Sequence, residues 1–328
     1  MQRSARSFIL VAVMLALPAA DPAQALNAKS WVSNVGSDLN DCSLAHPCAT
    51  FQGALLQTAA GGDIGVLTPS DYGGSSGSRL NIHQSLAVTN DGAGEATIFV
   101  AGGGVIVDAG VGDVVSLRGL VIDGQGGGFE GIALEQASAL HVQNCVIRNF
   151  QNPSSGFGII VNLTSGHSQL FVSDSIILNN GTIAGTGGIL VEPRGGASAN
   201  AVLNRVRVEN NVVGIVVDGS LATGGGNHVV IRDSVFSGNA ADGIFARTVA
   251  GQAPAFIVVE RTMSARNAGS GIRADGPGAT VLMGGSTLTR NGAGVTTRNG
   301  GQLISYGDND NNNNVGPEGS ATGMFAPF

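Results

Sequence analysis

Cationic side chains are scarce in this 328-residue sequence. Lysine occurs once, at Lys29, and the chain has 16 Lys and Arg against 23 Asp and Glu, for a formal net charge of −7. Binding to phosphate backbones and to anionic lipid surfaces depends on many basic side chains. We therefore expect no nucleic-acid partner and no attachment to an anionic membrane surface.

Long apolar runs are also missing. A membrane-spanning helix needs roughly 20 apolar residues, and the sequence contains no run of that length. The N-terminus carries Arg3 and Arg6, then an apolar stretch from Phe8 to Leu17, then Ala23-Gln24-Ala25. This order predicts a secretory signal peptide at residues 1–25, cleaved after Ala25. The alternative is an uncleaved anchor. We expect a secreted, periplasmic or cell-surface protein whose mature chain has no membrane span.

Cysteine is rare, with three residues in the chain. Cys42 and Cys48 flank a short segment that contains Pro47, and an exported protein meets an oxidising compartment, so we predict a Cys42–Cys48 disulfide. A metal site that uses His46 is the alternative, but it lacks a fourth ligand, and we predict no metal site. Cys145 lies inside an apolar run and is expected to be a buried, unreactive thiol.

Aromatic residues make up 5% of the chain, and stretches with helical periodicity are few, whereas glycine is abundant at 52 residues. Collagen is excluded because no Gly-X-Y period exists. The glycines lie beside Asn and Asp between short β-branched runs, which is the chemistry of turns between strands. Many short strands are therefore expected.

A repeat of roughly 23–30 residues runs through most of the chain. Each unit has a first short strand, a bend, a strand that begins with glycine, and a third strand. The second strands begin at Gly131, Gly158, Gly188, Gly214, Gly243, Gly271 and Gly294. Three strands per unit predict the coils of an all-β, single right-handed parallel β-helix, because parallel crossovers are overwhelmingly right-handed.

Stacked coils should place equivalent residues in columns. One apolar column of the first strand is expected to face the interior: Val121, Val146, Ile176, Val206, Val235, Met263 and Thr287. A second column at the following bend is expected to form a ladder of hydrogen-bonded amides: Asn180, Asn210, Asn239, Asn267 and Asn291.

The ends of such a stack need covers. Thr50 is a candidate N-cap for a helix over residues 51–59, which Gly61-Gly62 would end. The predicted organisation is an N-terminal cap segment at residues 26–62, a β-helix of roughly nine or ten coils at 63–316, and a C-terminal tail at 317–328.

The opening of the mature chain resembles that of a known group of proteins. It reads Trp31-Val32-Ser33, Gly36-Ser37-Asp38, Cys42, Pro47-Cys48-Ala49-Thr50-Phe51 and Gly62-Asp63-Ile64, and later coils repeat patterns such as Arg232-Asp233-Ser234-Val235-Phe236. These features are similar to exported, uncharacterised bacterial right-handed β-helix repeat proteins of the pectin-lyase-like superfamily. The resemblance implies a fold rather than an activity, because the polygalacturonase, alginate-epimerase and pectate-lyase motifs are absent from the sequence.

Charged residues form one further column directly after the second strands: Glu135, Asn162, Glu192, Asp218, Arg247, Asp275 and Arg298. Neighbours in this column should lie about 5 Å apart. Glu192 and Asp218 are then a candidate catalytic carboxylate pair, and Arg194 and Arg247 could join them in binding an acidic sugar. No cofactor is expected, although two adjacent carboxylates would suit Ca²⁺. The alternating signs from Asp218 onward equally fit a solvated structural ladder.

Three alternative functions are compatible with these features. The first is a non-catalytic protein of the cell envelope or exterior that binds a polysaccharide or envelope glycan. The second is a polysaccharide lyase, hydrolase or epimerase with an unfamiliar site, and the third is a structural or adhesive surface protein.

Overall fold

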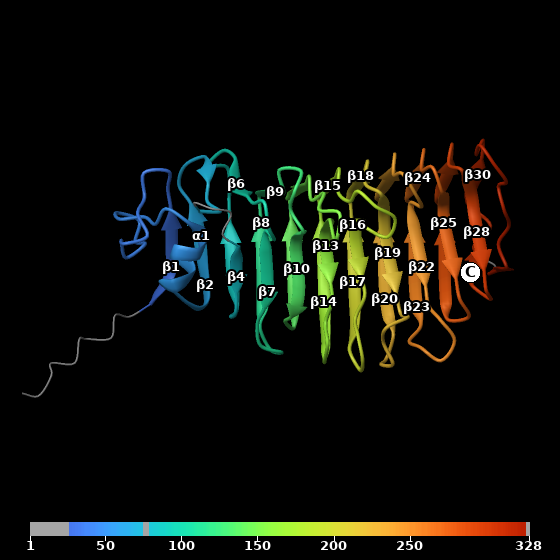
Figure 1. The fold of residues 1–328 in the computed structure, drawn as a ribbon, viewed down its shortest axis with the longest axis horizontal. Helices are drawn as coiled ribbons and strands as arrows, with labels where there is room; N and C mark the ends of the chain where they lie inside the picture. The colour runs from blue at the N-terminus through green and yellow to red at the C-terminus, as the bar shows by residue number, and fades with distance from the viewer. Residues whose placement is uncertain (1–25, 75–78, 326–328) are drawn as a thin grey trace, which may run out of the picture.

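The computed structural model describes residues 26–74 and 79–325, and these form a right-handed parallel β-helix of about nine coils, as predicted (Figure 1). The coils are stacked along the long axis of the molecule, from β1 at one end to β30 at the other. The predicted signal peptide lies outside the described residues. No helix within the described ranges is long and apolar enough to cross a membrane.

Three parallel sheets form the walls of the solenoid. Sheet A contains β1 (Asn27–Val32), β2 (Thr58–Val66), β5 (Leu86–Thr89), β8 (Val114–Arg118), β11 (Ala139–Gln143), β14 (His167–Ser173), β17 (Ser198–Asn204), β20 (Asn227–Arg232), β23 (Ala255–Glu260), β26 (Ala279–Gly284), β29 (Gln302–Ser305) and β31 (Gly323–Met324). Sheet B contains β3 (Ser70–Asp71), β6 (Ala96–Phe99), β9 (Leu120–Asp123), β12 (Val146–Arg148), β15 (Ile176–Leu178), β18 (Arg207–Glu209), β21 (Val235–Ser237), β24 (Met263–Ala265), β27 (Thr287–Thr289) and β30 (Asp310–Asn312). Sheet C contains β4 (Leu80–Ile82), β7 (Val105–Asp108), β10 (Glu130–Gln136), β13 (Phe157–Val161), β16 (Gly187–Val191), β19 (Val213–Asp218), β22 (Ile244–Arg247), β25 (Ser270–Asp275) and β28 (Ala293–Arg298).

The core is a set of apolar columns inside the coil. In sheet C, one isoleucine from each of six successive coils pairs in register and is fully buried: Ile132, Ile159, Ile189, Ile215, Ile244 and Ile272. Side chains alternate across a strand, so the residues between these inner positions face outward. This alternation fixes which side chains are available for binding on the outer face.

The apolar column predicted for the interior of sheet B in fact faces outward, so that prediction is wrong. Met263 is 41% exposed, and the buried column is one residue later: Ile122, Ile147, Ile177, Val208, Phe236, Ser264 and Leu288. Val206 also does not belong to the predicted column, because Arg207 pairs with Ile176 and with Val235. In three-residue strands, the first and third residues share the outer face, and apolar character alone does not reveal this direction.

The predicted asparagine ladder is present, but one of its members is Asn211 and not Asn210. Each side-chain amide donates to the side-chain oxygen of the next coil through Asn180, Asn211, Asn239, Asn267, Asn291 and Asn314. Asn210 is not a member; it is exposed and has a φ of 56°. In the pair Asn210-Asn211, the first residue accepts the left-handed backbone conformation and the second forms the ladder.

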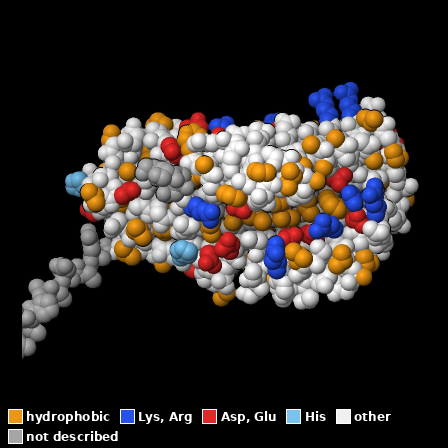
Figure 2. Space-filling model, viewed as in Figure 1, with side chains coloured by type: hydrophobic (Ala, Val, Ile, Leu, Met, Phe, Trp, Pro, Cys, Tyr) orange, Lys and Arg blue, Asp and Glu red, His pale blue; other side chains and the backbone are white. Residues whose placement is uncertain are grey.

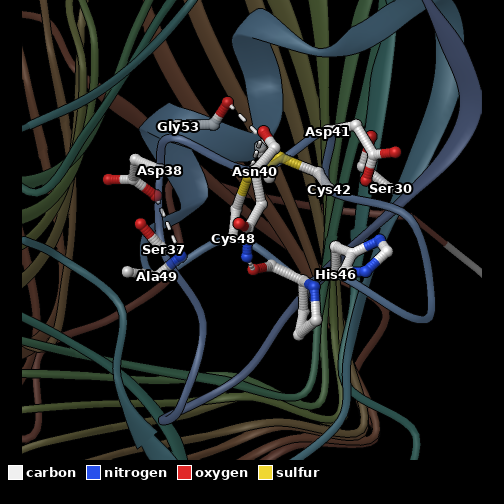
Figure 3. The surroundings of a disulfide bond; sticks show 12 residues. Ser30, Ser37, Asp38, Asn40, Asp41, Cys42, His46, Cys48, Ala49 and Gly53 are labelled. Atoms are coloured by element: carbon white, nitrogen blue, oxygen red, sulfur yellow. Dashed lines mark hydrogen bonds between the residues drawn. A yellow bond between two sulfur atoms is a disulfide. The ribbon is translucent and has the colours of Figure 1, made fainter.

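The N-terminal end is covered by α1 (Phe51–Leu56), which packs Phe51, Ala54 and Leu55 into the core. The helix is shorter than the predicted 51–59, because β2 already begins at Thr58, and Gly61 and Gly62 lie within β2 instead of ending the helix. Its N-cap is Thr50, whose hydroxyl accepts a hydrogen bond from the backbone N–H of Gly53, as expected. The Cys42–Cys48 disulfide is confirmed and lies beside this helix, with the two Cα atoms 4.8 Å apart (Figure 3). The carboxylate of Asp38 accepts hydrogen bonds from the backbone N–H groups that lead into the helix.

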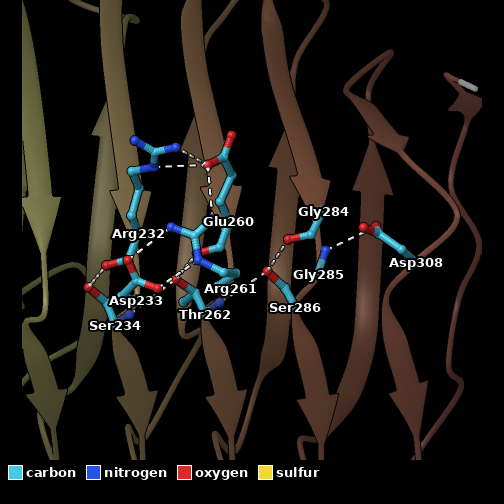
Figure 4. Close-up of polar contacts among 10 residues, drawn as sticks. All are labelled: Arg232, Asp233, Ser234, Glu260, Arg261, Thr262, Gly284, Gly285, Ser286 and Asp308. Carbon is cyan, nitrogen blue, oxygen red and sulfur yellow. Dashed lines mark hydrogen bonds and ion pairs between the residues drawn. The ribbon is translucent and has the colours of Figure 1, made fainter. Parts of the chain in front are cut away.

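The turns between sheets A and B are held by polar ladders that the sequence analysis did not anticipate. The hydroxyl oxygen of Thr262 accepts from the backbone N–H of Ser234, and that of Ser286 accepts from the N–H of Thr262 (Figure 4). Next to them, Arg261 donates two hydrogen bonds to Asp233 of the preceding coil. These contacts fix the register of successive coils.

Candidate functional site

The predicted column of charged residues exists at the carboxyl ends of the sheet C strands. Asp218 pairs with Arg247, Arg247 with Asp275, and Asp275 with Arg298 in the strand register. Glu192 directly follows Val191, which pairs with Val217, so Glu192 lies in the coil next to Asp218 at the equivalent position. The repeat therefore brings the two carboxylates together as expected.

Asp218 is buried, and both of its carboxylate oxygens have partners. One oxygen lies 2.5 Å from a guanidinium nitrogen of Arg247, and the other accepts a hydrogen bond of 2.8 Å from the backbone N–H of Ser220. Only 2% of the Asp218 side chain is exposed, against 49% of Arg247. The carboxylate is thus fixed in place, whereas one side of the guanidinium remains open to solvent.

Glu192 is held differently. Arg194 donates to its carboxylate at 2.8 Å, and 13% of the Glu192 side chain is exposed. Burial raises the pKa of Glu192, the neighbouring charge of Asp218 raises it further, and Arg194 and Arg247 partly oppose both effects. Glu192 therefore holds a proton more readily than a free glutamate does.

A groove of about 270 Å³ runs beside this pair. Its floor consists of outward-facing apolar side chains of neighbouring coils, Leu190, Val216 and Phe245, and its rim includes Glu192 and Asp218. Figure 2 shows hydrophobic side chains in a band across the middle of this face, with acidic and basic side chains along one edge of the band. The groove thus combines an apolar floor with a charged rim.

Arg273 forms one end of the groove. Its guanidinium lies over the ring of Phe245 at 4.5 Å from the centroid, 2.5 Å from a carboxylate oxygen of Asp275 and 3.5 Å from one of Asp242. Its Nε–H is buried and has no hydrogen-bond partner in the described part of the chain. A buried, unpaired N–H of this kind is costly, whereas 24% of the Arg273 side chain is exposed and borders the groove.

Three of the four predicted binding residues line the groove, and the fourth does not. Glu192, Asp218 and Arg247 line the groove, whereas Arg194 contacts Glu192 and is not among the lining residues. Sequence reasoning missed Phe245 and Arg273. A signal for them was available, because each lies two residues before a member of the charged column and therefore shares its outward face.

No metal centre is evident in residues 26–74 and 79–325, where no three His, Cys, Asp or Glu side chains are grouped to hold an ion. Ca²⁺ takes six to eight oxygen ligands, and Asp218 is already paired with Arg247. An ion beside Glu192 would need most of its ligands from water or a bound molecule, so Ca²⁺ binding stays a prediction.

Comparison with known proteins supports the architecture. No protein family model and no curated protein sequence matches the chain. Among solved structures, the chain is similar to the crystal structure of pectate lyase Pel9A, with a TM-score of 0.58, 15% identity, and coverage of 91% of this chain and 78% of that one. It also aligns with the GH136 lacto-N-biosidase from Eubacterium ramulus, with a TM-score of 0.42, 11% identity, and coverage of 90% and 67%. The fold is a parallel β-helix like that of Pel9A.

Proposed function

We propose that this is an exported glycan-binding protein whose ligand lies in the sheet C groove. The observation that carries the proposal is one groove of about 270 Å³ that combines an apolar floor with the charged side chains of Glu192, Arg247 and Arg273. Sugar rings have apolar C–H faces and polar hydroxyl edges. The faces suit Leu190, Val216 and the exposed part of Phe245, and the hydroxyls suit Glu192 and Arg273.

An exported location is part of this proposal. The predicted signal peptide at residues 1–25 supports it, and so does the Cys42–Cys48 bond, because disulfides persist mainly in oxidising compartments. A periplasmic, secreted or surface-attached protein would meet polysaccharides or envelope glycans as its partners. The structural neighbour Pel9A, a pectate lyase by name, has the same kind of fold, and a fold can carry many functions.

Polysaccharide cleavage is the second candidate, favoured by the raised pKa of Glu192 beside Asp218. A carboxyl group with a raised pKa is a property of general acids in glycoside hydrolysis, which work with a second carboxyl group nearby. Asp218 accepts from both Arg247 and Ser220, and its side chain is 2% exposed, so little of this carboxylate is accessible to a substrate. Binding without cleavage therefore fits this geometry better than a lyase, hydrolase or epimerase reaction.

The test begins with a glycan array, followed by calorimetric titration of the best oligosaccharide against wild type and a Glu192→Gln/Asp218→Asn double variant. We expect the double variant to bind at least about tenfold more weakly, because Glu192 loses the charge that strengthens its hydrogen bonds to sugar hydroxyls and Asp218 loses the charge that holds Arg247 in place. Glu209→Gln, which removes a carboxylate paired with Arg207 on sheet B, is the matched control and should bind normally.

Two results would overturn the proposal: no binding to any glycan, or equal affinity in wild type and in a folded double variant. The enzymatic alternative is measured separately with assays for reducing ends and unsaturated products on a polysaccharide panel. If either single variant loses turnover by 10²-fold or more, as expected for a missing acid or base, the cleavage function is correct instead.

A further inference from the structure

Two arginines follow the sheet B strands β24 and β27 at positions where this fold elsewhere uses small or adaptable residues. Arg266 and Arg290 have φ values of 56° and 57°. The residues directly after five other sheet B strands, β12, β15, β18, β21 and β30, also have positive φ: Asn149, Asn179, Asn210, Gly238 and Asn313. Asparagine and glycine accept this left-handed conformation readily, whereas a long side chain is strained in it.

The two guanidinium groups also lack partners. Among the residues that the structure describes, neither Arg266 nor Arg290 forms an ion pair or a side-chain hydrogen bond, and both are exposed. Arg205 and Arg261 provide a comparison, because they too have positive φ, but each donates two hydrogen bonds to an aspartate. The strained backbone of Arg205 and Arg261 is thus accompanied by an ion pair. That of Arg266 and Arg290 is not.

Stacking adds a second unfavourable effect. β24 and β27 are neighbouring strands, and neighbouring strands lie about 4.8 Å apart, so Arg266 and Arg290 place like charges in adjacent coils. The rest of the surface mostly avoids this, as the alternation of Asp218, Arg247 and Asp275 shows. Strained residues that persist against such costs mark candidate binding sites.

Both arginines line one open groove of about 590 Å³ on the outer face of sheet B. Its apolar floor includes Val235 and Met263, and Met263 is 41% exposed. On the other side, Arg207 is held by two hydrogen bonds to Glu209 and is therefore less available. The open cationic groups in this groove are those of Arg266 and Arg290.

We propose that Arg266 and Arg290 together bind a sulfate or phosphate group, either as the free anion or as an ester on a larger molecule. A guanidinium is a planar fork that donates two parallel hydrogen bonds to an oxyanion, and two such forks suit a doubly charged group. The apolar floor beside them would accept the body of an esterified molecule. This site lies on sheet B, away from the groove on sheet C, and does not depend on the function proposed for that groove.

The test is calorimetric titration at low ionic strength with inorganic phosphate, inorganic sulfate, glucose and glucose 6-phosphate. The variants are Arg266→Asn and Arg290→Asn, which install the residue that other coils carry at this position. The control is Arg298→Gln, which removes an exposed charge from the end of β28 in sheet C. We expect each asparagine variant to lower phosphate affinity by about tenfold or more, and the control to leave it within about twofold.

Thermal unfolding of the same variants separates binding from folding. Both asparagine variants should unfold at or above the wild-type temperature, since asparagine relieves the strain at positive φ. Tighter binding of glucose 6-phosphate than of inorganic phosphate would identify an ester as the ligand, and equal binding would identify the free anion. The inference is overturned if wild type binds none of the anions, or if folded Arg266→Asn and Arg290→Asn variants bind phosphate as wild type does.

Discussion

Replacement of Asn239 by leucine tests the asparagine ladder in the middle of the stack. Asn239 is 1% exposed. Its amide nitrogen donates to the side-chain oxygen of Asn267 at 2.8 Å, and its oxygen accepts from the backbone N–H of Asn211 at 3.0 Å and from the Asn211 amide at 3.3 Å. Leucine has nearly the same size but can make none of these three bonds.

The expected loss follows from which groups are left without partners. The backbone N–H of Asn211 remains buried and unpaired, which costs about 1–3 kcal/mol, and the other broken bonds add about 1 kcal/mol each at most. The Asn267 oxygen still accepts from the backbone N–H of residue 239, so its contribution is small. We expect Asn239→Leu to lower the free energy of unfolding by about 2–4 kcal/mol.

Urea unfolding measures this change through the midpoint, provided that the slope stays constant. Asn211→Leu should be destabilised by a similar amount, since it occupies the next place in the ladder. Asn210→Gly is the matched control and should change stability little, because Asn210 is exposed and glycine accepts its φ of 56°. A midpoint for Asn239→Leu equal to that of Asn210→Gly would refute this reasoning.

Two further predictions concern single side chains. Cys145 is buried and its thiol pKa is raised to about 11 by burial, so alkylation and intact mass should find no modified cysteine in the native protein and one after denaturation without reductant; a native protein labelled at Cys42 or Cys48 would contradict the disulfide. Glu192 has a pKa raised above its ordinary 4.5, so the folded state holds that proton more tightly, and its contribution to stability falls as pH rises from the unfolded pKa through the folded one. Glu192→Gln should therefore lose less stability than wild type as the pH rises above 4.5, and superimposable profiles of unfolding temperature would disprove the assignment.

The architecture was predictable because the same sequence pattern occurs in most coils. Each coil repeats the same order of strand, bend and strand, so errors in single coils, such as Val206 for Arg207, do not change the fold. Which side chains of a short strand face the core was harder to predict. Whether Met263 or Ser264 faces the core depends on where the turn ends, and the side chains alone suggest the opposite of what is found.

The candidate site was partly predictable for the same reason. The column through Glu192, Asp218 and Arg247 follows from the repeat, and the structure shows these residues in the expected register. The groove itself was not foreseen, since it depends on how the loop carrying Ala184 and Gly185 lies against the outer face of sheet C. Loop positions of this kind arise from tertiary packing and leave no periodic trace in a sequence.

The central claim is that the sheet C groove holds a glycan. The most direct measurement is a crystal structure of the protein with the oligosaccharide that binds best on the array. We expect a sugar ring packed over Leu190 and Val216, with a sugar hydroxyl donating a hydrogen bond to the carboxylate of Glu192. An oligosaccharide bound on sheet A or sheet B, with the sheet C groove occupied by water alone, would contradict it.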